Sequence, residues 1–98
     1  MSVRVIAGQA KGRSLTRPRK AVVRPTTDLV RGALFSILAP NLPDSRVLDL
    51  FAGTGALGIE ARSRGAASAE FVDNDPRQCA DIRASIDVCG YTDRSVVH

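Results

Sequence analysis

The feature that most constrains the fold of this chain is a glycine-rich turn between a short apolar strand and the start of a helix. The segment begins at Val47 and carries Gly53, Gly55 and Gly58 in the spacing G-x-G-x-x-G. Glycine has no Cβ, so the backbone can turn tightly there with a positive φ and can lie close to a bound molecule. The first N–H groups of the following helix point toward the turn. The segment therefore predicts a cradle for a nucleotide-like ligand.

Asp49, set inside the strand, separates the two cofactor classes that use such a turn. The glycine spacing alone matches the fingerprint of dinucleotide-binding proteins, which would make the chain a nicotinamide-dependent dehydrogenase. A pyrophosphate, however, would meet the negative charge of Asp49 just before the first glycine. S-adenosylmethionine carries no phosphate, and its α-ammonium group suits a carboxylate at the end of the first strand through a charge-assisted hydrogen bond. The sequence therefore favours S-adenosylmethionine over NAD.

A second carboxylate follows where this interpretation requires one. Asp73 stands twenty residues after Gly53, at the end of the next apolar segment, where it can bind ribose hydroxyls. A simpler interpretation stays open, in which Asp49 caps a turn and Asp73 is a solvated strand end. Strand, acid, glycines, helix and second acid nevertheless arrive in the order that a cofactor site needs.

Charge is distributed unevenly along the 98 residues. Residues 1–45 contain eight Lys or Arg and two acidic residues, whereas residues 46–98 contain six and eight, so the balance changes from +6 to −2. A basic segment ahead of a slightly acidic core is typical of proteins that bind a polyanion, most simply a nucleic acid. A solvated basic face is the alternative that charge alone leaves open.

The basic segment is predicted to begin with a small β-hairpin. Two short strands, 3–7 and 13–17, flank a turn at 8–12 that contains two glycines. The cations that we expect to contact phosphates are Arg4, Lys11, Arg13, Arg17 and Arg24. No aromatic residue precedes Phe35, so the segment has no surface for base stacking and would bind by charge and shape.

The rest of the chain alternates helices and strands. A first helix is expected to open near residues 26–28 and to end before Pro40. Its predicted apolar face consists of Val30, Ala33, Leu34, Ile37 and Leu38. After it we expect strands at 46–50, 69–73 and from 95 onward, and helices at 56–64 and 76–90. This order predicts a parallel sheet, with residues 1–23 as a basic arm and 24–98 as part of an α/β domain.

Simple counts disfavour other classes of protein. No apolar run is long enough to span a bilayer and the N-terminus lacks a signal peptide's apolar core, which predicts a soluble, cytoplasmic protein. Cys79 and Cys89 fall in one predicted helix about 15 Å apart, too far for a disulfide. They share its apolar face with Ile82 and Ile86. With His98 as the only histidine, no metal site is expected.

Three stretches of the sequence together resemble the RsmD family, whose members methylate the exocyclic N2 of a guanine in bacterial small-subunit ribosomal RNA. They are residues 5–13, 24–35 and 48–61, and residues 63–66 and 71–75 extend the match. The glycine turn is common to many methyltransferases, whereas its combination with Arg-Pro-Thr-Thr-Asp at residues 24–28 is much more specific. The resemblance covers the chain to about Gly90.

This resemblance implies a class I S-adenosylmethionine-dependent methyltransferase fold with a Rossmann-like parallel sheet. It also implies S-adenosylmethionine as the donor and ribosomal RNA or the small ribosomal subunit as the partner. The residues that it assigns to cofactor binding are Asp49, Phe51, Gly53, Thr54, Gly55, Gly58, Asp73 and Asn74. Asp73 stands where the family usually has Glu, one methylene longer. Arg62 stands where the family has an apolar residue, and it is expected at the surface.

The part of the family that grips the acceptor base has no counterpart in this sequence. Its Asp/Asn-Pro-Pro-aromatic motif is missing, because the five prolines include no adjacent pair, so no catalytic residue is assigned. We therefore expect the N-terminal part of the enzyme, with residues 47–51 as an open, apolar sheet edge and a complementary C-terminal half as a further partner. Such a chain would be marginally stable and prone to association. A non-catalytic RNA-binding remnant of a truncated methyltransferase is the alternative.

Overall fold

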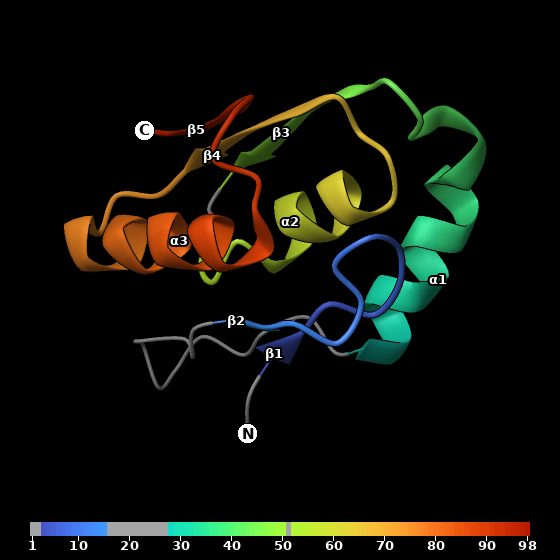
Figure 1. Cartoon of the computed structure of the whole chain (residues 1–98), viewed down its shortest axis with the longest axis horizontal. Coiled ribbons are helices and arrows are strands. Elements are labelled where there is room, and N and C mark those ends of the chain that lie inside the picture. Colours follow the sequence, from blue (N-terminus) through green and yellow to red (C-terminus); the bar gives the residue numbers. More distant parts are fainter. Residues whose placement is uncertain (1–2, 16–27, 51) are drawn as a thin grey trace.

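The computed structural model describes residues 3–15, 28–50 and 52–98, and its elements alternate as the sequence predicts (Figure 1). Their order is β1 (Val3–Arg4), β2 (Ser14–Leu15), α1 (Asp28–Leu38), the 3-10 turn η1 (Ala39–Asn41), β3 (Arg46–Leu50), α2 (Ala56–Ser63), β4 (Ser68–Val72), α3 (Pro76–Cys89) and β5 (Ser95–Val97). From β3 onward, every strand and helix lies within one residue of its predicted bounds. The expected helix opening near residues 26–28 lies largely outside the described residues.

The central sheet consists of three parallel strands in the order β3-β4-β5. Asp49 on β3 is opposite Phe71 on β4, which is opposite Val97 on β5. Successive residues of a strand point to opposite faces, and Leu48 and Leu50 lie on the face away from Asp49, where they are 57% and 58% exposed. Within the described residues nothing pairs with the other side of β3, so the predicted open edge is confirmed.

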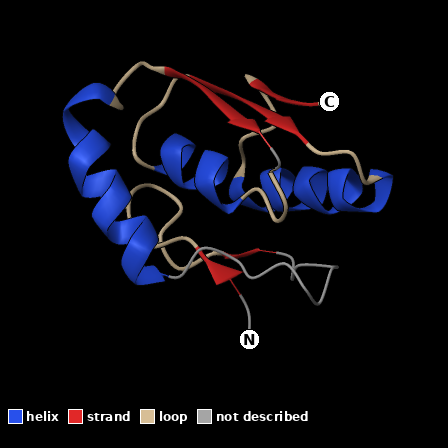
Figure 2. Ribbon diagram, turned by 180° about the vertical axis from the view of Figure 1, so that it is seen from behind, coloured by secondary structure: helices blue, strands red, loops and turns tan. Residues whose placement is uncertain are grey.

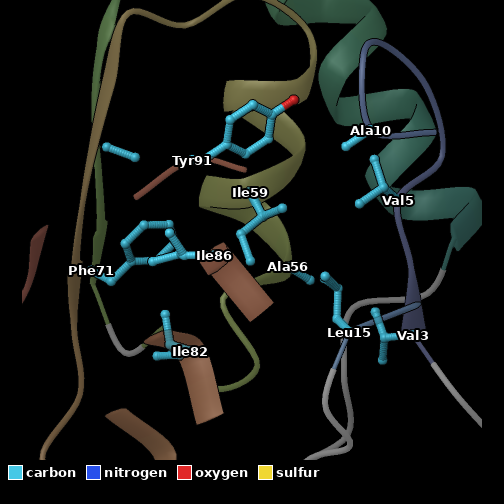
Figure 3. Packing of buried hydrophobic residues seen from close by; sticks show 11 residues of the cluster. Val3, Val5, Ala10, Leu15, Ala56, Ile59, Phe71, Ile82, Ile86 and Tyr91 are labelled. Carbon is cyan, nitrogen blue, oxygen red and sulfur yellow. The ribbon is translucent and has the colours of Figure 1, made fainter. Parts of the chain in front are cut away.

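Two helices lie between the sheet and the N-terminal hairpin (Figures 1 and 2). α2 and α3 cover one face of the sheet, and the hairpin lies on the side of these helices that faces away from it. One hydrophobic cluster connects the three layers, and Figure 3 shows its side chains. Its buried members are Val3, Val5, Ala10, Leu15, Ala56, Ile59, Ala69, Phe71, Ile82, Ile86 and Tyr91. The hairpin and the α/β part therefore share one core.

The hairpin itself is confirmed, and its ladder within the described residues pairs Val3–Arg4 with Ser14–Leu15. Val3 of β1 is opposite Leu15 of β2 in antiparallel register. Beyond the strands, the N–H of Val5 donates to the carbonyl of Arg13 (3.0 Å), and the N–H of Gly12 donates to the carbonyl of Val5 (2.9 Å). These bonds continue the pairing toward the turn and give the hairpin a defined shape.

α3 shows why its bounds could be predicted so closely. Its N-cap is Asp75, whose side chain accepts a hydrogen bond from the N–H of Arg77 (2.9 Å), and Pro76 takes the first helical position. It ends at Gly90, which has the left-handed φ of 78° that glycine tolerates best. These local signals need no knowledge of the tertiary structure.

α1 buries a different face from the one that its apolar pattern predicts. Arg31 and Phe35 are 0% and 3% exposed, whereas Ile37, on the predicted apolar face, is 75% exposed. Phe35 packs with Leu42 and with two alanines in a second hydrophobic cluster. The predicted buried face was therefore wrong, because the position of α1 is set by the contacts of Arg31 and Phe35.

Leu34 and Leu38 of α1 instead border an apolar groove along the open edge of β3. The groove is lined by Leu34, Phe35, Leu38, Leu42, Val47, Leu48, Asp49, Leu57, Gly58 and Ala61. Its walls come from α1, β3 and α2. In the part of the chain that the structure describes, no element fills it.

The cysteines behave as expected for residues of a helix core face. Cys79 is buried, Cys89 is half-buried, and neither forms a disulfide. Ile82 and Ile86 on the same face belong to the main hydrophobic cluster. None of the described helices has the length and apolar content that crossing a bilayer requires.

Candidate functional site

The glycine-rich turn between β3 and α2 has the geometry that the sequence predicts. Gly53 and Gly55 have φ angles of +58° and +79°, which side chains with a Cβ rarely adopt. Gly55 is the N-cap of α2, and its N–H donates to the carbonyl of Ala52 (2.8 Å). A Cβ built on Gly53 would meet no atom within 4 Å. The turn is therefore open on the side of Gly53, where a ligand can lie against the backbone.

Gly58, the third glycine of the motif, has a packing role. A Cβ at this position would lie 2.4 Å from a ring carbon of Phe71 on β4, a distance that atoms of a folded protein do not adopt. The glycine thus lets α2 lie close against the sheet, as the third glycine does in dinucleotide-binding turns. Its N–H donates to Oδ2 of Asp49 (3.1 Å), so it also holds the first carboxylate of the site.

Asp49 is a buried carboxylate, 7% exposed. Burial raises its pKa from 3.8 to about 6; the hydrogen bond from Gly58 lowers the pKa, and the nearby charge of Asp73 raises it further. A carboxylate in this state gains stability from a cation that approaches it, because the cation offsets both the desolvation and the repulsion. The site is therefore electrostatically suited to a positively charged ligand group.

Asp73 holds the turn in place from the end of β4. Its Oδ2 accepts a hydrogen bond from the N–H of Gly53 (3.0 Å), and its Oδ1 accepts one from the N–H of Asp75 (3.0 Å). Each carboxylate oxygen has a second lone pair, so the side chain can still accept hydrogen bonds from hydroxyl groups. Asn74, which follows it, is exposed.

Two predicted cofactor residues, Phe51 and Thr54, remain to be placed. Thr54 is buried and its Oγ1 accepts a hydrogen bond from the N–H of Ala56 (3.3 Å), in the first turn of α2. Phe51 lies outside the described residues. The structure therefore brings Asp49, the glycine turn and Asp73 together and gives Thr54 a role within the protein.

The cations predicted to bind RNA lie partly within the described residues. Arg4, Lys11 and Arg13 are exposed on the hairpin, where the guanidinium of Arg4 also donates to the carbonyl of Gly12 (3.4 Å). Arg17 and Arg24 lie outside the described residues. The described hairpin thus presents three positive charges to solvent.

Glu60 on α2 is a buried charged residue that sequence reasoning missed. It is 0% exposed, and its carboxylate accepts hydrogen bonds from the backbone N–H groups of Ile6 (2.8 Å) and Ala7 (3.0 Å). Nε of Arg64 donates to the same carboxylate (2.8 Å), and Nη1 of Arg31 lies 3.7 Å from it. No local signal in the sequence marks Glu60, because the amides that satisfy it lie more than fifty residues earlier.

Arg62, which the sequence predicts at the surface, has its side chain bound to other parts of the protein. Its Nη1 donates to the carbonyls of Asp93 (2.9 Å) and Arg94 (3.0 Å) and to Oγ of Ser95 (2.9 Å). Its guanidinium lies 4.9 Å from the centre of the Tyr91 ring, in the geometry of a cation–π contact. Arg62 therefore holds the loop between α3 and β5.

The described residues contain no group of three or more His, Cys, Asp or Glu side chains that could hold a metal ion. The two carboxylates at the glycine turn accept hydrogen bonds from backbone N–H groups and keep free lone pairs. The chemistry of this site is therefore that of an acidic cradle built on a glycine turn.

Comparison with known proteins places this site in context. The family described as conserved hypothetical protein 95 matches residues 3–98. Ribosomal RNA small subunit methyltransferase D of Escherichia coli is 52% identical over 73 residues, which make up 74% of this chain and 37% of that protein. YlbH of Bacillus subtilis is 41% identical over 96 residues, which make up 98% of this chain and 52% of that protein.

The fold is similar to that of a solved relative as well. The structure of yhhF from Escherichia coli superimposes with a TM-score of 0.87 and 39% identity, covering 100% of this chain and 53% of that one. The chain spans about half the length, or less, of these relatives. Because the family match runs from the first strand to the last residue, this chain belongs to the RsmD family of methyltransferases, with the class I methyltransferase fold.

Proposed function

We propose that this chain supplies the S-adenosylmethionine-binding side of an enzyme that methylates N2 of a guanine in small-subunit ribosomal RNA in the cytoplasm. The observation that carries the proposal is the pair of carboxylates at the glycine turn. Asp49 is buried beside the start of α2, and Asp73 holds the N–H of Gly53. The relatives named as ribosomal RNA methyltransferases support the reaction class.

The residues present fit this cofactor better than a dinucleotide. The negative charge of Asp73 is one of the causes that raise the pKa of Asp49. The electrostatic field at the turn is therefore negative and disfavours a pyrophosphate. An ammonium group, by contrast, is attracted by the same field. The open side of Gly53 leaves the backbone accessible to a ligand. The nicotinamide-dependent dehydrogenase therefore has no support from the charges of the site.

Each part of the site has a distinct task in this proposal. Asp49 would bind the α-ammonium group, Asp73 would accept hydrogen bonds from the ribose hydroxyls, and the backbone of residues 53–55 would hold the ligand against α2. S-adenosylmethionine supplies an electrophilic methyl group when it is bound. The residues of this chain contribute by orienting the donor, because positioning is the main source of rate acceleration in such a displacement.

RNA would be bound by the hairpin and the basic residues that follow it. Arg4, Lys11 and Arg13 are exposed and can each neutralise a phosphate, which predicts an affinity that falls steeply with salt. We propose RNA rather than another polyanion because the Escherichia coli relative is named as a ribosomal RNA methyltransferase. The arm would position the RNA backbone, while the identity of the base would be read elsewhere.

Turnover would require a complementary half. The apolar groove beside β3 and the exposed side chains of Leu48 and Leu50 form a surface that the remaining half of a full-length relative would cover. The acceptor base would be held by that half. This chain alone would therefore bind the cofactor and RNA without transferring the methyl group.

Equilibrium dialysis with radiolabelled S-adenosylmethionine, in the presence and absence of excess NAD, tests the cofactor. We expect retention of one equivalent of label that NAD does not displace. Filter binding of small-subunit ribosomal RNA over a salt series tests the arm. Binding of NAD in place of S-adenosylmethionine would contradict the proposal, and salt-dependent RNA binding without cofactor retention would favour the RNA-binding remnant.

A further inference from the structure

The helix that begins at the glycine turn also holds the basic hairpin. The N-terminal end of α2 follows Gly55, and its C-terminal half carries Glu60 and Ser63, which contact the hairpin. Glu60 lies five residues after Gly55, about 7–8 Å along the helix axis. A single rigid helix therefore connects the candidate donor site to the candidate RNA arm.

Glu60 contacts the hairpin through both of its carboxylate oxygens. Oε1 accepts from the N–H of Ile6, and Oε2 accepts from the N–H of Ala7. The carboxylate is completely buried, so it is stable only because these amides and the guanidinium of Arg64 satisfy it. Arg31 reinforces the same contact from α1, since its Nη2 donates to the carbonyl of Arg4 (2.9 Å).

Ser63, one turn further along α2, holds the turn of the hairpin. Its Oγ donates to the carbonyl of Ala7 (2.6 Å) and accepts from the N–H of Ala10 (2.9 Å), and its carbonyl accepts from the N–H of Gln9 (2.8 Å). The backbone approaches so closely that a Cβ on Gly8 would lie 2.0 Å from the carbonyl oxygen of Ser63. Only glycine, here with φ of +88°, fits this contact.

These polar contacts fix the position of the hairpin on α2, which the shared hydrophobic core cannot do by itself. Val3, Val5 and Leu15 pack against the helix layer (Figure 3), but apolar burial is non-directional and would tolerate sliding of the hairpin. Hydrogen bonds to fixed backbone groups have strict distance and angle requirements. The polar contacts of Glu60 and Ser63 therefore determine where the hairpin lies on α2.

We propose that Glu60 and Ser63 are positioning residues for RNA: they fix Arg4, Lys11 and Arg13 at a set distance and orientation from the cofactor turn. The inference rests on the proposed function, because it assigns a purpose to the arm's location. An RNA backbone bound to an arm fixed in this way is held relative to the methyl donor by one helix. An arm released from α2 keeps its charges but must be ordered each time RNA binds.

The substitution Glu60→Gln tests this, with Glu70→Gln as the matched control. Both substitutions remove one negative charge, but Glu70 is exposed on the sheet, and within the described residues the hydrogen-bond partner of its side chain is the ring of His98. Charge alone therefore predicts slightly tighter RNA binding for both variants. Fixation of the arm predicts instead that Glu60→Gln weakens binding of small-subunit ribosomal RNA about tenfold, with an unchanged salt slope because the released arm keeps its charges.

The affinity for S-adenosylhomocysteine separates positioning from general loss of structure. We expect it to stay within about twofold of wild type in Glu60→Gln, while hydrogen exchange at the amides of Ile6 and Ala7 accelerates. RNA binding by Glu60→Gln as tight as that of Glu70→Gln would overturn the inference. Absence of RNA binding by the wild-type chain would instead refute the RNA part of the proposed function.

A second variant keeps the test decisive if Glu60→Gln does not fold. Ser63→Ala removes the hydroxyl that contacts Ala7 and Ala10 and leaves the buried charge of Glu60 in place. We expect a smaller loss of RNA affinity, about threefold, with unchanged affinity for S-adenosylhomocysteine. Unchanged RNA affinity in a folded Ser63→Ala chain, combined with a misfolded Glu60→Gln, would also overturn the positioning role.

Discussion

The replacement Asp49→Asn should make the folded chain more stable at neutral pH while it removes the site for a cationic ligand. The carboxylate is buried and its pKa is raised from 3.8 to about 6, chiefly by burial. A group whose pKa rises on folding contributes stability that is complete below pH 3.8 and is lost as the pH rises through about 6. At pH 7 the wild-type chain therefore carries the full cost of a charged, buried Asp49.

The size of the effect follows from the shift in pKa. A change from 3.8 to about 6 corresponds to about 3 kcal/mol, at about 1.4 kcal/mol for each pKa unit. Asparagine has no charge to bury, and its side-chain carbonyl can still accept the hydrogen bond from Gly58. We therefore expect the free energy of unfolding of Asp49→Asn to exceed that of wild type by an amount that grows by about 2 kcal/mol between pH 4.5 and pH 7.5.

Urea denaturation followed by circular dichroism at several pH values measures this difference directly. All other titrating groups are the same in both proteins, so their contributions cancel, and a constant offset between amide and acid does not affect the trend. Parallel stability curves for the two proteins, or a gap that narrows as the pH rises, would refute the reasoning. Either result would mean that Asp49 is not desolvated as its burial indicates.

Three further variants test the glycine turn and the loop between α3 and β5. Gly58→Ala should lower the free energy of unfolding by about 1–3 kcal/mol, because the added methyl group would collide with Phe71. Gly53→Ala should lower it by only about 1–2 kcal/mol, through backbone strain. Its main effect should be weaker binding of S-adenosylhomocysteine. Thermal melts and titrations of both variants check this, and a Gly53→Ala chain with wild-type affinity would count against a ligand lying on the turn. Arg62→Ala should destabilise the chain by about 1–2 kcal/mol through loss of the hydrogen bonds to the loop between α3 and β5, and an unchanged melting temperature would show that these contacts contribute nothing.

The elements of the α/β part could be predicted from the sequence because their signals are local. Asp75, Pro76 and Gly90 mark both ends of α3 by chemistry that acts within one helical turn. The glycine turn was predictable for the same reason, since positive φ angles at Gly53 and Gly55 follow from the identity of single residues. That Asp49 and Asp73 both lie at this turn follows from the parallel order of β3 and β4.

The burial of charged residues could not be predicted, because it depends on groups far away in the sequence. Glu60 is satisfied by the amides of Ile6 and Ala7, more than fifty residues earlier, and a glutamate in a helix is ordinarily solvated. Arg31 is buried by its contacts with the same carboxylate and the hairpin. No local pattern distinguishes these side chains from those of an exposed helix face.

The prediction of which face of α1 is buried was wrong for a related reason. A periodic apolar pattern indicates which side of a helix can be buried, but burial also requires an element that covers it. Leu34 and Leu38 border the groove beside β3, and Leu48 on that strand is exposed. The described part of this chain contains nothing that covers that face, and the relatives are about twice as long or longer.

Calorimetric titration of the purified chain with S-adenosylhomocysteine, compared with Asp49→Ala, tests the central claim most directly. The claim is that the donor site assembles from the glycine turn, Asp49 and Asp73 without the rest of a full-length relative. It predicts saturable binding at one site per chain, lost in the variant. Absence of binding by a chain that circular dichroism shows to be folded would contradict it.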